Sequence, residues 1–173
     1  MLNITQIENA LYAWIQPIAG VTTIFAHPNA PRPKTSYVLI NILQSSPVGI
    51  EEHEISALKV DKSIDIDYSN VEELFVTINV YYAGAYQLAT KIKDSLGRIT
   101  VKDVLFAAGL GYSRTSEVRD IPEEINKQWE ERGQFDCFFF TRSSDQENIE
   151  TIRKIEIENE MDGTTTVVTH PND

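Results

Sequence analysis

Apolar residues recur at three- and four-residue steps in three stretches of the chain, which is the period of an amphipathic helix. Residues 4–18 form the first stretch and begin beside two possible N-caps, Asn3 and Thr5, each followed three residues later by Gln or Glu. Residues 84–96 and 100–109 repeat the period. The pattern therefore predicts one N-terminal helix and two central helices.

Alternation of apolar and polar residues predicts strands in the segments around these helices. Residues 22–27 and 36–43 are the first two, and 36–43 is apolar on both faces, which favours a central place in the sheet. Residues 55–68 and 71–82 alternate over long spans. We expect these two strands to form a hairpin that turns around residues 69–70.

The C-terminal part of the chain is predicted to return to the sheet. Residues 112–120 and 134–142 have strand character, and the polar residues 121–129 between them are expected to form a turn. The order of elements predicts an α+β fold, a mainly antiparallel β-sheet flanked by an N-terminal helix and two central helices. We expect one domain over residues 1–158 and a C-terminal tail, a short strand or frayed end, over 159–173.

The polar segments between strands carry two further expectations. Residues 45–54 contain Pro and Gly and are expected to form a loop. Asp61, Asp65 and Asp67 alternate along one face of the expected strand, with lysines nearby. Such carboxylates can bind calcium or do acid–base work, but this spacing is more typical of a solvated strand face.

Composition limits the classes of function. The chain has 173 residues and a net charge of −11, from 15 Lys and Arg against 26 Asp and Glu. A protein that holds nucleic acid through its phosphates needs a basic face, so we do not expect that role. No apolar run approaches the length of a membrane span, and no secretory signal pattern opens the chain.

Residues that usually carry chemistry are few and scattered. The three histidines lie far apart, at His27, His53 and His170. The single cysteine, Cys137, excludes an internal disulfide and a cysteine-based zinc site, and it fits a cytoplasmic origin. We therefore expect no catalytic residue, no metal site and no cofactor, although residues distant in sequence can meet in a fold.

Two segments are unusual. Residues 27–43, "HPNAPRPKTSYVLINIL", place three prolines and two basic residues directly before an apolar strand. The prolines hold this connection extended, with few conformations to lose on folding. Near the end of the chain, "WEERGQFDCFFF" places Trp129 and Arg132 before an aromatic strand. Trp129 is either an edge-packing residue or an interface anchor, since Trp and Arg are both favoured in interface hot spots.

Together these segments resemble the neck or tail terminator proteins of tailed bacteriophages and prophages. In that family an Asn-Ala-Pro-x-Pro segment leads into a Tyr-containing strand, and a Trp-x-x-Arg precedes an aliphatic or aromatic strand. The first motif is matched by Asn29, Ala30, Pro31, Arg32, Pro33 and Tyr37, and the second by Trp129 and Arg132. The order of elements is similar over residues 4–158.

The resemblance implies a structural virion protein that is not an enzyme. Its members form a ring, usually a hexamer, that caps the last ring of the tail tube, stops tube growth and joins the tail to the head. The implied partners are other copies of the chain, the tail-tube protein, a head-completion or connector protein and, in contractile tails, the sheath. DNA would pass through the ring without specific binding, and an acidic lumen would repel its phosphates. Assembly would take place in the cytoplasm of the bacterial host.

The resemblance makes the two motifs candidate subunit or partner interfaces. The candidate residues are Asn29, Ala30, Pro31, Arg32, Pro33, Lys34, Tyr37, Trp129 and Arg132. Arg32 and Lys34 could pair with acidic residues of a neighbouring subunit, or the proline segment could be a rigid surface crossover within one subunit. Two other functions remain open: another ring component of the neck or tail, such as a head-completion or tail-tube subunit, and a monomeric module that holds a small ligand in its sheet.

Overall fold

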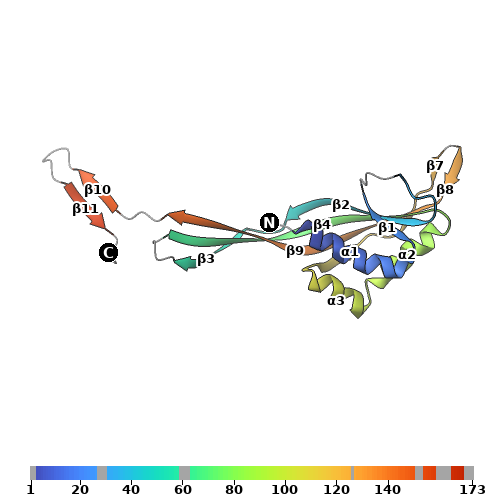
Figure 1. Cartoon of the computed structure of the whole chain (residues 1–173), viewed down its shortest axis with the longest axis horizontal. Helices are drawn as coiled ribbons and strands as arrows, with labels where there is room; N and C mark the ends of the chain where they lie inside the picture. The colour runs from blue at the N-terminus through green and yellow to red at the C-terminus, as the bar shows by residue number, and fades with distance from the viewer. Residues whose placement is uncertain are drawn as a thin grey trace. The chain divides into compact units, whose positions relative to one another are not determined.

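The computed structural model of the chain describes residues 3–26, 31–58, 63–125, 127–150, 154–158 and 165–169. The chain divides into two compact units. The first unit joins Met1–Glu51 to Asn70–Ser143, and the second joins Glu52–Ser69 to Ser144–Asp173. Figure 1 shows that the helices all lie along the strands of the first unit.

Three helices are found where the hydrophobic period predicts them. They are α1 (Ile4–Ala19), α2 (Ala85–Ser95) and α3 (Ile99–Ala107). Of the two possible caps of α1, the side chain of Asn3 is used: its oxygen accepts the backbone N–H of Gln6 at 3.1 Å. Gly20 ends α1 in the left-handed conformation, with φ 66°, which costs a glycine little.

The main sheet is mostly antiparallel, which confirms the predicted α+β class. Its strands run in the order β1-β2-β4-β9-β5, with β3 paired to β4 and β6 paired to β9. The strands are β1 (Thr22–Phe25), β2 (Tyr37–Pro47), β3 (Glu52–Leu58), β4 (Ser63–Tyr81), β5 (Gly111–Thr115), β6 (Arg119–Asp120) and β9 (Arg132–Glu150). β1 and β2 pair in parallel, with Thr22 opposite Tyr37, so their connection is a crossover.

The core lies between the helices and one face of this sheet. Alternate residues of β2, β4 and β9 supply the buried sheet side: Val38, Ile40, Leu74, Val76, Ile78, Val80, Phe135, Cys137 and Phe139. Trp14 of α1 meets Phe139 edge to face, with ring centroids 6.2 Å apart. The indole N–H of Trp14 donates to the hydroxyl of Ser95 at 2.8 Å, so its polar atom is satisfied in the core.

The predicted position of the long hairpin is wrong. Glu52 of β3 lies opposite Ser69, and Leu58 lies opposite Ile64, so the chain reverses between Leu58 and Ser63. Residues 69–70 lie inside β4 instead of forming a turn. Two partners explain this, because the backbone of β4 pairs first with β3 and then with β2, which satisfies its peptide groups without a break. The expected loop at 45–54 is likewise shorter, since β2 continues to Pro47 and β3 begins at Glu52.

The expected solvated face of this hairpin is also partly wrong. Ser63 and Asp65 are buried, and the side-chain amide of Asn148 in β9 donates to the Ser63 hydroxyl at 3.1 Å and to the Asp65 carboxylate at 2.6 Å. The amide of Gln146 donates to Asp67 at 2.8 Å. Polar side chains of β9 therefore cover this face, which alternation alone cannot reveal. Asp61 lies outside the described residues.

Two small hairpins stand apart from the main sheet. The region predicted as a polar turn forms β7 (Glu123–Ile125) and β8 (Gln128–Glu130), which pair antiparallel. In the second unit, β10 (Lys154–Glu158) pairs antiparallel with β11 (Thr165–Thr169). No helix within the described ranges is long and apolar enough to cross a membrane.

Candidate functional site

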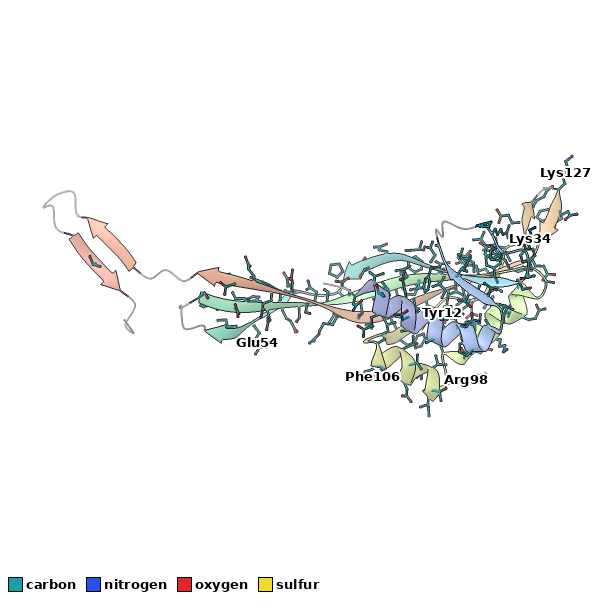
Figure 2. All side chains as sticks on the ribbon, viewed as in Figure 1. Tyr12, Lys34, Glu54, Arg98, Phe106 and Lys127 are labelled. Carbon is teal, nitrogen blue, oxygen red and sulfur yellow. The ribbon has the colours of Figure 1, made fainter. Side chains whose placement is uncertain are left out.

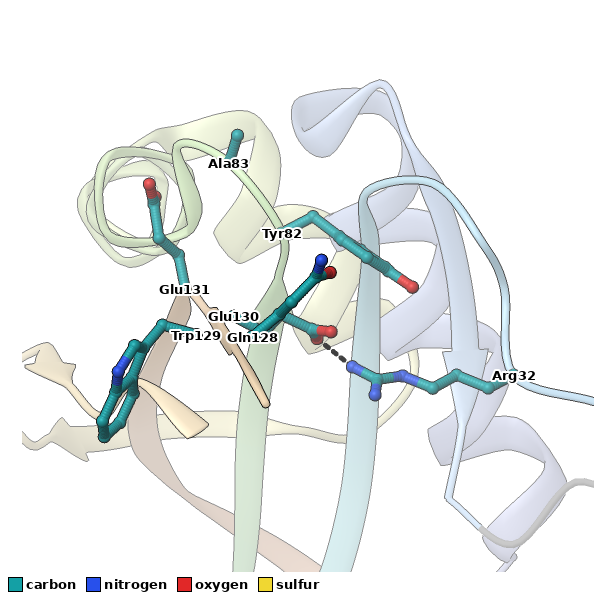
Figure 3. A pocket seen from close by; sticks show the side chains of 7 residues that line it. All are labelled: Arg32, Tyr82, Ala83, Gln128, Trp129, Glu130 and Glu131. Atoms are coloured by element: carbon teal, nitrogen blue, oxygen red, sulfur yellow. Dashed lines mark hydrogen bonds and ion pairs between the residues drawn. The ribbon is translucent and has the colours of Figure 1, made fainter. Parts of the chain in front are cut away.

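Arg32 is the centre of a cluster that fastens the proline-containing crossover to the sheet. Its guanidinium carbon lies 5.0 Å from the ring centroid of Tyr81, 5.5 Å from that of Tyr82 and 5.7 Å from that of Tyr37. The Nε of Arg32 donates to the Tyr37 hydroxyl at 2.8 Å, and a terminal nitrogen forms an ion pair with Glu130 (Figure 3). The planar guanidinium can stack on aromatic rings and donate hydrogen bonds to a carboxylate at the same time, which a lysine ammonium cannot do.

The rings of Tyr37, Tyr81 and Tyr82 pack together beneath Arg32 and are called the tyrosine platform below. Tyr37 of β2 lies opposite Tyr81 of β4, and their rings stack at 4.7 Å with an interplanar angle of 11°. Burial raises the pKa of Tyr37 above its ordinary value. The Tyr82 hydroxyl donates to the carbonyl of Pro33 at 3.1 Å, which ties the crossover down at a second point.

Glu130 and Glu131, which follow Trp129, bind two different elements of the fold. Glu130 binds Arg32 of the crossover. Glu131 accepts the backbone N–H of Gly84 at 2.8 Å, so its carboxylate lies at the N-terminus of α2, where the helix dipole favours negative charge. The carbonyl of Glu131 accepts the N–H of Tyr82 at 3.0 Å, and Tyr82 has a positive φ of 72°. These contacts hold a backbone conformation that is strained for a tyrosine.

Arg132 binds the opposite face of the sheet from the core. Its Nε and a terminal nitrogen donate to the side-chain oxygen of Asn79, at 3.2 and 2.9 Å, and Asn79 is only 4% exposed. Its guanidinium carbon lies 5.4 Å from the Tyr81 ring, on the same platform as Arg32. A weaker ion pair reaches Glu123 at 3.7 Å. Arg132 therefore joins β9 to β4 and to the β7–β8 hairpin.

Gly133, the next residue, lies against the start of α2. A Cβ at this position would be 2.7 Å from the carbonyl oxygen of Ala85, which is closer than real Cβ atoms approach backbone. The absence of a side chain lets β9 pass under the helix. This close approach places Glu131 within reach of the helix N-terminus.

A hollow of about 530 Å³ opens beside the cluster. It is lined by Arg32, Tyr82, Ala83, Gln128, Trp129, Glu130 and Glu131 (Figure 3). Four of these, Arg32, Tyr82, Glu130 and Glu131, already contact other groups of the chain. Among the described residues, no three His, Cys, Asp or Glu side chains gather in a way that could hold a metal ion.

The sequence model of a family described as phage neck terminator protein matches residues 5–164. This span covers the crossover, the tyrosine platform and the run from Trp129 to Gly133. The chain belongs to the phage neck terminator family. No curated protein sequence matches it. The family predicted by resemblance is thus confirmed.

Most of the residues proposed as an interface of the neck terminator converge in the structure. Pro33, Arg32, Tyr37 and Arg132 surround or contact the tyrosine platform, and Trp129 lies beside the hollow with 73% of its surface exposed. Pro31 and Lys34 are exposed on the crossover, and Asn29 and Ala30 lie outside the described residues. The carboxylate that binds Arg32 is in the same chain rather than in a neighbour. Whether these residues contact a subunit or partner stays a prediction.

Sequence reasoning missed five residues of this neck terminator site: Asn79, Tyr81, Tyr82, Glu130 and Glu131. The two adjacent tyrosines precede Ala83 and Gly84, and this pairing was a usable signal because one ring must then leave the core face. The partner of Arg32 could not be found this way, since Glu130 lies 98 residues further along the chain.

The face of the first unit that lies away from the helices carries ion pairs and hydrogen bonds within the chain beside its aromatic rings. The carboxylate of Asp136 accepts the Thr77 hydroxyl at 2.9 Å and forms an ion pair with Arg119. Arg114 forms an ion pair with Glu73 and lies over the ring of Phe138 at 4.0 Å. Arginines of the neck terminator are thus held by its own carboxylates.

Proposed function

We propose that this chain forms a ring, a homohexamer, at the top of a phage tail, where it ends growth of the tail tube and joins the tail to the head. Membership of the neck terminator family over residues 5–164 carries this proposal. The chain would act as a virion component that is assembled in the cytoplasm of the bacterial host. Its partners would be the tail-tube protein, a head-completion or connector protein and, in a contractile tail, the sheath.

A structural role is supported by how the polar groups near the hollow are used. Arg32, Glu130 and Glu131 each bind another element of the fold, so their charged groups are engaged in structural contacts rather than placed to act on a substrate as acid, base or nucleophile. Burial raises the pKa of Cys137 well above its usual range, which keeps its thiol protonated and unreactive. We propose that the chain is not an enzyme.

The charge of the chain supports passage of DNA without binding. The net charge is −11, and Arg32, Arg114, Arg119 and Arg132 are each paired with a carboxylate. Phosphate contacts need free cations that can displace counterions. We expect the purified chain to leave the gel mobility of duplex DNA unchanged at low salt, where electrostatic binding is strongest. A complex that dissociates as salt is added would contradict a lumen that does not bind DNA.

Electron microscopy of the purified chain and of tails tests the proposal directly. Negative-stain images should show six-fold rings with a central hole, alone or at one end of tubes made from the tail-tube protein. Tubes grown with the chain present should stop at a ring, whereas tubes grown without it should be longer and vary in length. Rings that stack along the tube would indicate a tube subunit instead, and a monomer that leaves tube length unchanged would contradict a terminator.

A further inference from the structure

Helix α3 exposes apolar side chains on more than one side. Val101 and Leu105 point into the core and are buried. Ile99 and Phe106 are 77% and 80% exposed, and Val104 is 38% exposed. A short helix in a soluble protein usually turns polar residues outward, so the exposure of Ile99 and Phe106, seven residues apart on one side of α3, marks an interaction surface.

A small hollow lies beside this helix. Its volume is about 240 Å³, and it is lined by Lys102, Leu105, Phe106, Leu110, Gly111 and Tyr112. The lining is mainly apolar and includes two aromatic rings, so an aromatic side chain would fit its chemistry. Its one charged lining residue is basic, and a second exposed basic residue, Arg98, directly precedes α3. Asp103, also exposed on α3, follows Lys102, so the positive charge of this surface is confined to the hollow that Lys102 lines and to Arg98.

The β7–β8 hairpin has the complementary character. Trp129 of β8 is 73% exposed, and its direct cross-strand partner in β7 is Glu124, which is also exposed. Glu123 lies opposite Glu130 on the other face of the hairpin, where it pairs with Arg132. Cross-strand partners lie on the same face of a hairpin, so the indole of Trp129 and the carboxylate of Glu124 are presented together.

The described residues of the α3 surface and of the β7–β8 hairpin do not contact each other within one subunit. Both belong to the first unit. In the view of Figure 2, Phe106 and Arg98 lie at its lower edge, whereas Lys127 at the hairpin tip lies at its upper right. Two different complementary patches on one chain allow a head-to-tail contact, and such contacts generate rings when the rotation between subunits closes.

We propose that the β7–β8 hairpin of one subunit docks on α3 of the next, with Trp129 in the hollow beside Phe106 and Tyr112 and with Glu124 facing Lys102. The occupant is a second copy of this chain, because Lys102 beside the α3 hollow and Glu124 beside Trp129 carry opposite charges, which gives two chains with a net charge of −11 an attractive pair at this contact. Trp129 is the anchor of the contact. The inference rests on the proposed ring, and it names the surfaces that form it.

Disulfide cross-linking of the full chain tests the contact. The natural Cys137 is buried, so it does not compete with introduced cysteines. A mixture of Trp129→Cys and Phe106→Cys chains should form a covalent dimer under mild oxidation, whereas each variant alone should not. The double variant should give a ladder that ends at the number of subunits in the ring. A mixture of Trp129→Cys with Tyr12→Cys, an exposed position on α1, is the matched control and should not cross-link above background.

A charge exchange gives a second readout. Lys102→Glu should weaken self-association several-fold in light scattering or native mass spectrometry, and adding Glu124→Lys to the same chain should restore it. Trp129→Ala should weaken association by about tenfold or more, as for an interface hot spot. Circular dichroism should show that these exposed substitutions leave the fold intact.

The failure of this inference differs from the failure of the proposed function. Wild-type rings without a 129–106 cross-link, and without an effect of Trp129→Ala, would overturn the inference and leave the ring standing. A folded wild-type chain with no ring and no effect on tube length would overturn the proposed function. A specific 129–106 cross-link in that case would still establish the contact between copies.

Discussion

At the scale of single residues, Arg32 shows how much one side chain fixes in this fold. It meets three tyrosine rings, donates to the hydroxyl of Tyr37 and binds the carboxylate of Glu130. The crossover that carries it joins two parallel strands and has no helix of its own in its described part. The order of the described part of this segment therefore depends on side-chain contacts such as those of Arg32.

Replacing Arg32 with lysine should destabilise the chain although the charge is kept. The ammonium cannot donate to Tyr37 and Glu130 in the fork geometry and cannot stack on the rings, so we expect a loss of about 1–2 kcal/mol in the free energy of unfolding. Urea unfolding measures this loss. Lys34→Arg, at an exposed position of the same crossover, should change stability by less than about 0.5 kcal/mol. Equal effects of the two exchanges would show that the cluster does not hold the crossover.

Tyr37 makes the stability of the fold sensitive to alkaline pH. Burial raises its pKa in the folded state, so the unfolded chain loses the phenolic proton first as the pH rises. The stabilisation is complete below the pKa of an unfolded tyrosine, about 10, and is lost as the pH rises toward the folded value. Unfolding free energy should thus fall less steeply above about pH 9.5 in Tyr37→Phe than in the wild type. Tyr12→Phe, on the exposed side of α1, should follow the wild type.

At the scale of elements, the fit between β9 and α2 depends on a missing side chain. Gly133 lets the strand pass so close to the helix that a Cβ would lie 2.7 Å from the carbonyl oxygen of Ala85. The same approach brings Glu131 to the N-terminus of α2. Helix and strand are therefore positioned by backbone contact as well as by the apolar core.

Gly133→Ala should be strongly destabilising because the backbone of α2 must move to admit a methyl group. We expect a loss of about 1–3 kcal/mol, the usual range for overpacking, in thermal or urea unfolding. Gly111→Ala is the matched control: it also lies in a strand, but the nearest atom to its Cβ would be 3.6 Å away, an ordinary contact. A Gly133→Ala chain as stable as the control would mean that α2 adjusts without cost.

Elements that the hydrophobic period defines were predictable from the sequence. The stripe of α1 and the apolar strand 36–43 fall where the structure has α1 and β2. The continuation of β4 through residues 69–70 could not be predicted from the sequence. Ser69 and Asn70 are residues that favour turns, but here they lie in a strand whose backbone pairs with β3 and then with β2. The sequence predicts a turn in place of the β7–β8 hairpin because the two strands are only three residues long and mostly polar.

The candidate site was predictable in its residues but not in its contacts. Arg32, Tyr37 and Arg132 were found from motif resemblance, and the structure brings them to one tyrosine platform. The interaction of Arg32 with Glu130 depends on how β4, β9 and the crossover come together, which local pattern does not encode. The sequence left open whether this arginine pairs with a neighbouring subunit or belongs to a rigid crossover within one subunit, and in the structure it pairs with Glu130 of the same chain.

At the scale of the whole molecule, the apolar core belongs to one of the two compact units. Every residue of the core cluster lies within Met1–Glu51 or Asn70–Ser143. In the second unit, strands β3, β4 and β9 are joined by polar contacts such as those of Asn148, and β10 and β11 form a separate two-stranded sheet. An isolated two-stranded sheet is marginally stable in water, so the two units should differ in stability.

Removing residues 151–173 should leave the main unfolding transition in place. The deletion takes away β10 and β11 but no member of the core cluster, so the unfolding temperature should change by no more than a few degrees. Differential scanning calorimetry of the shortened and full chains measures this. A loss of the cooperative transition on deletion would show that the C-terminal hairpin supports the core of the first unit.

The run from Trp129 to Gly133 has a consequence for how neck terminator sequences can change over time. Each of its five consecutive residues makes a different contact. Trp129 lies on the hairpin surface, Glu130 binds the crossover and Glu131 binds the start of α2. Arg132 then binds the sheet face, and Gly133 packs against the helix. A substitution removes one of these contacts, whereas one inserted or deleted residue turns every following side chain to the other face. Descendants of this sequence should therefore differ in residue identity within the run but keep its length, and alignments of the family should place their gaps elsewhere.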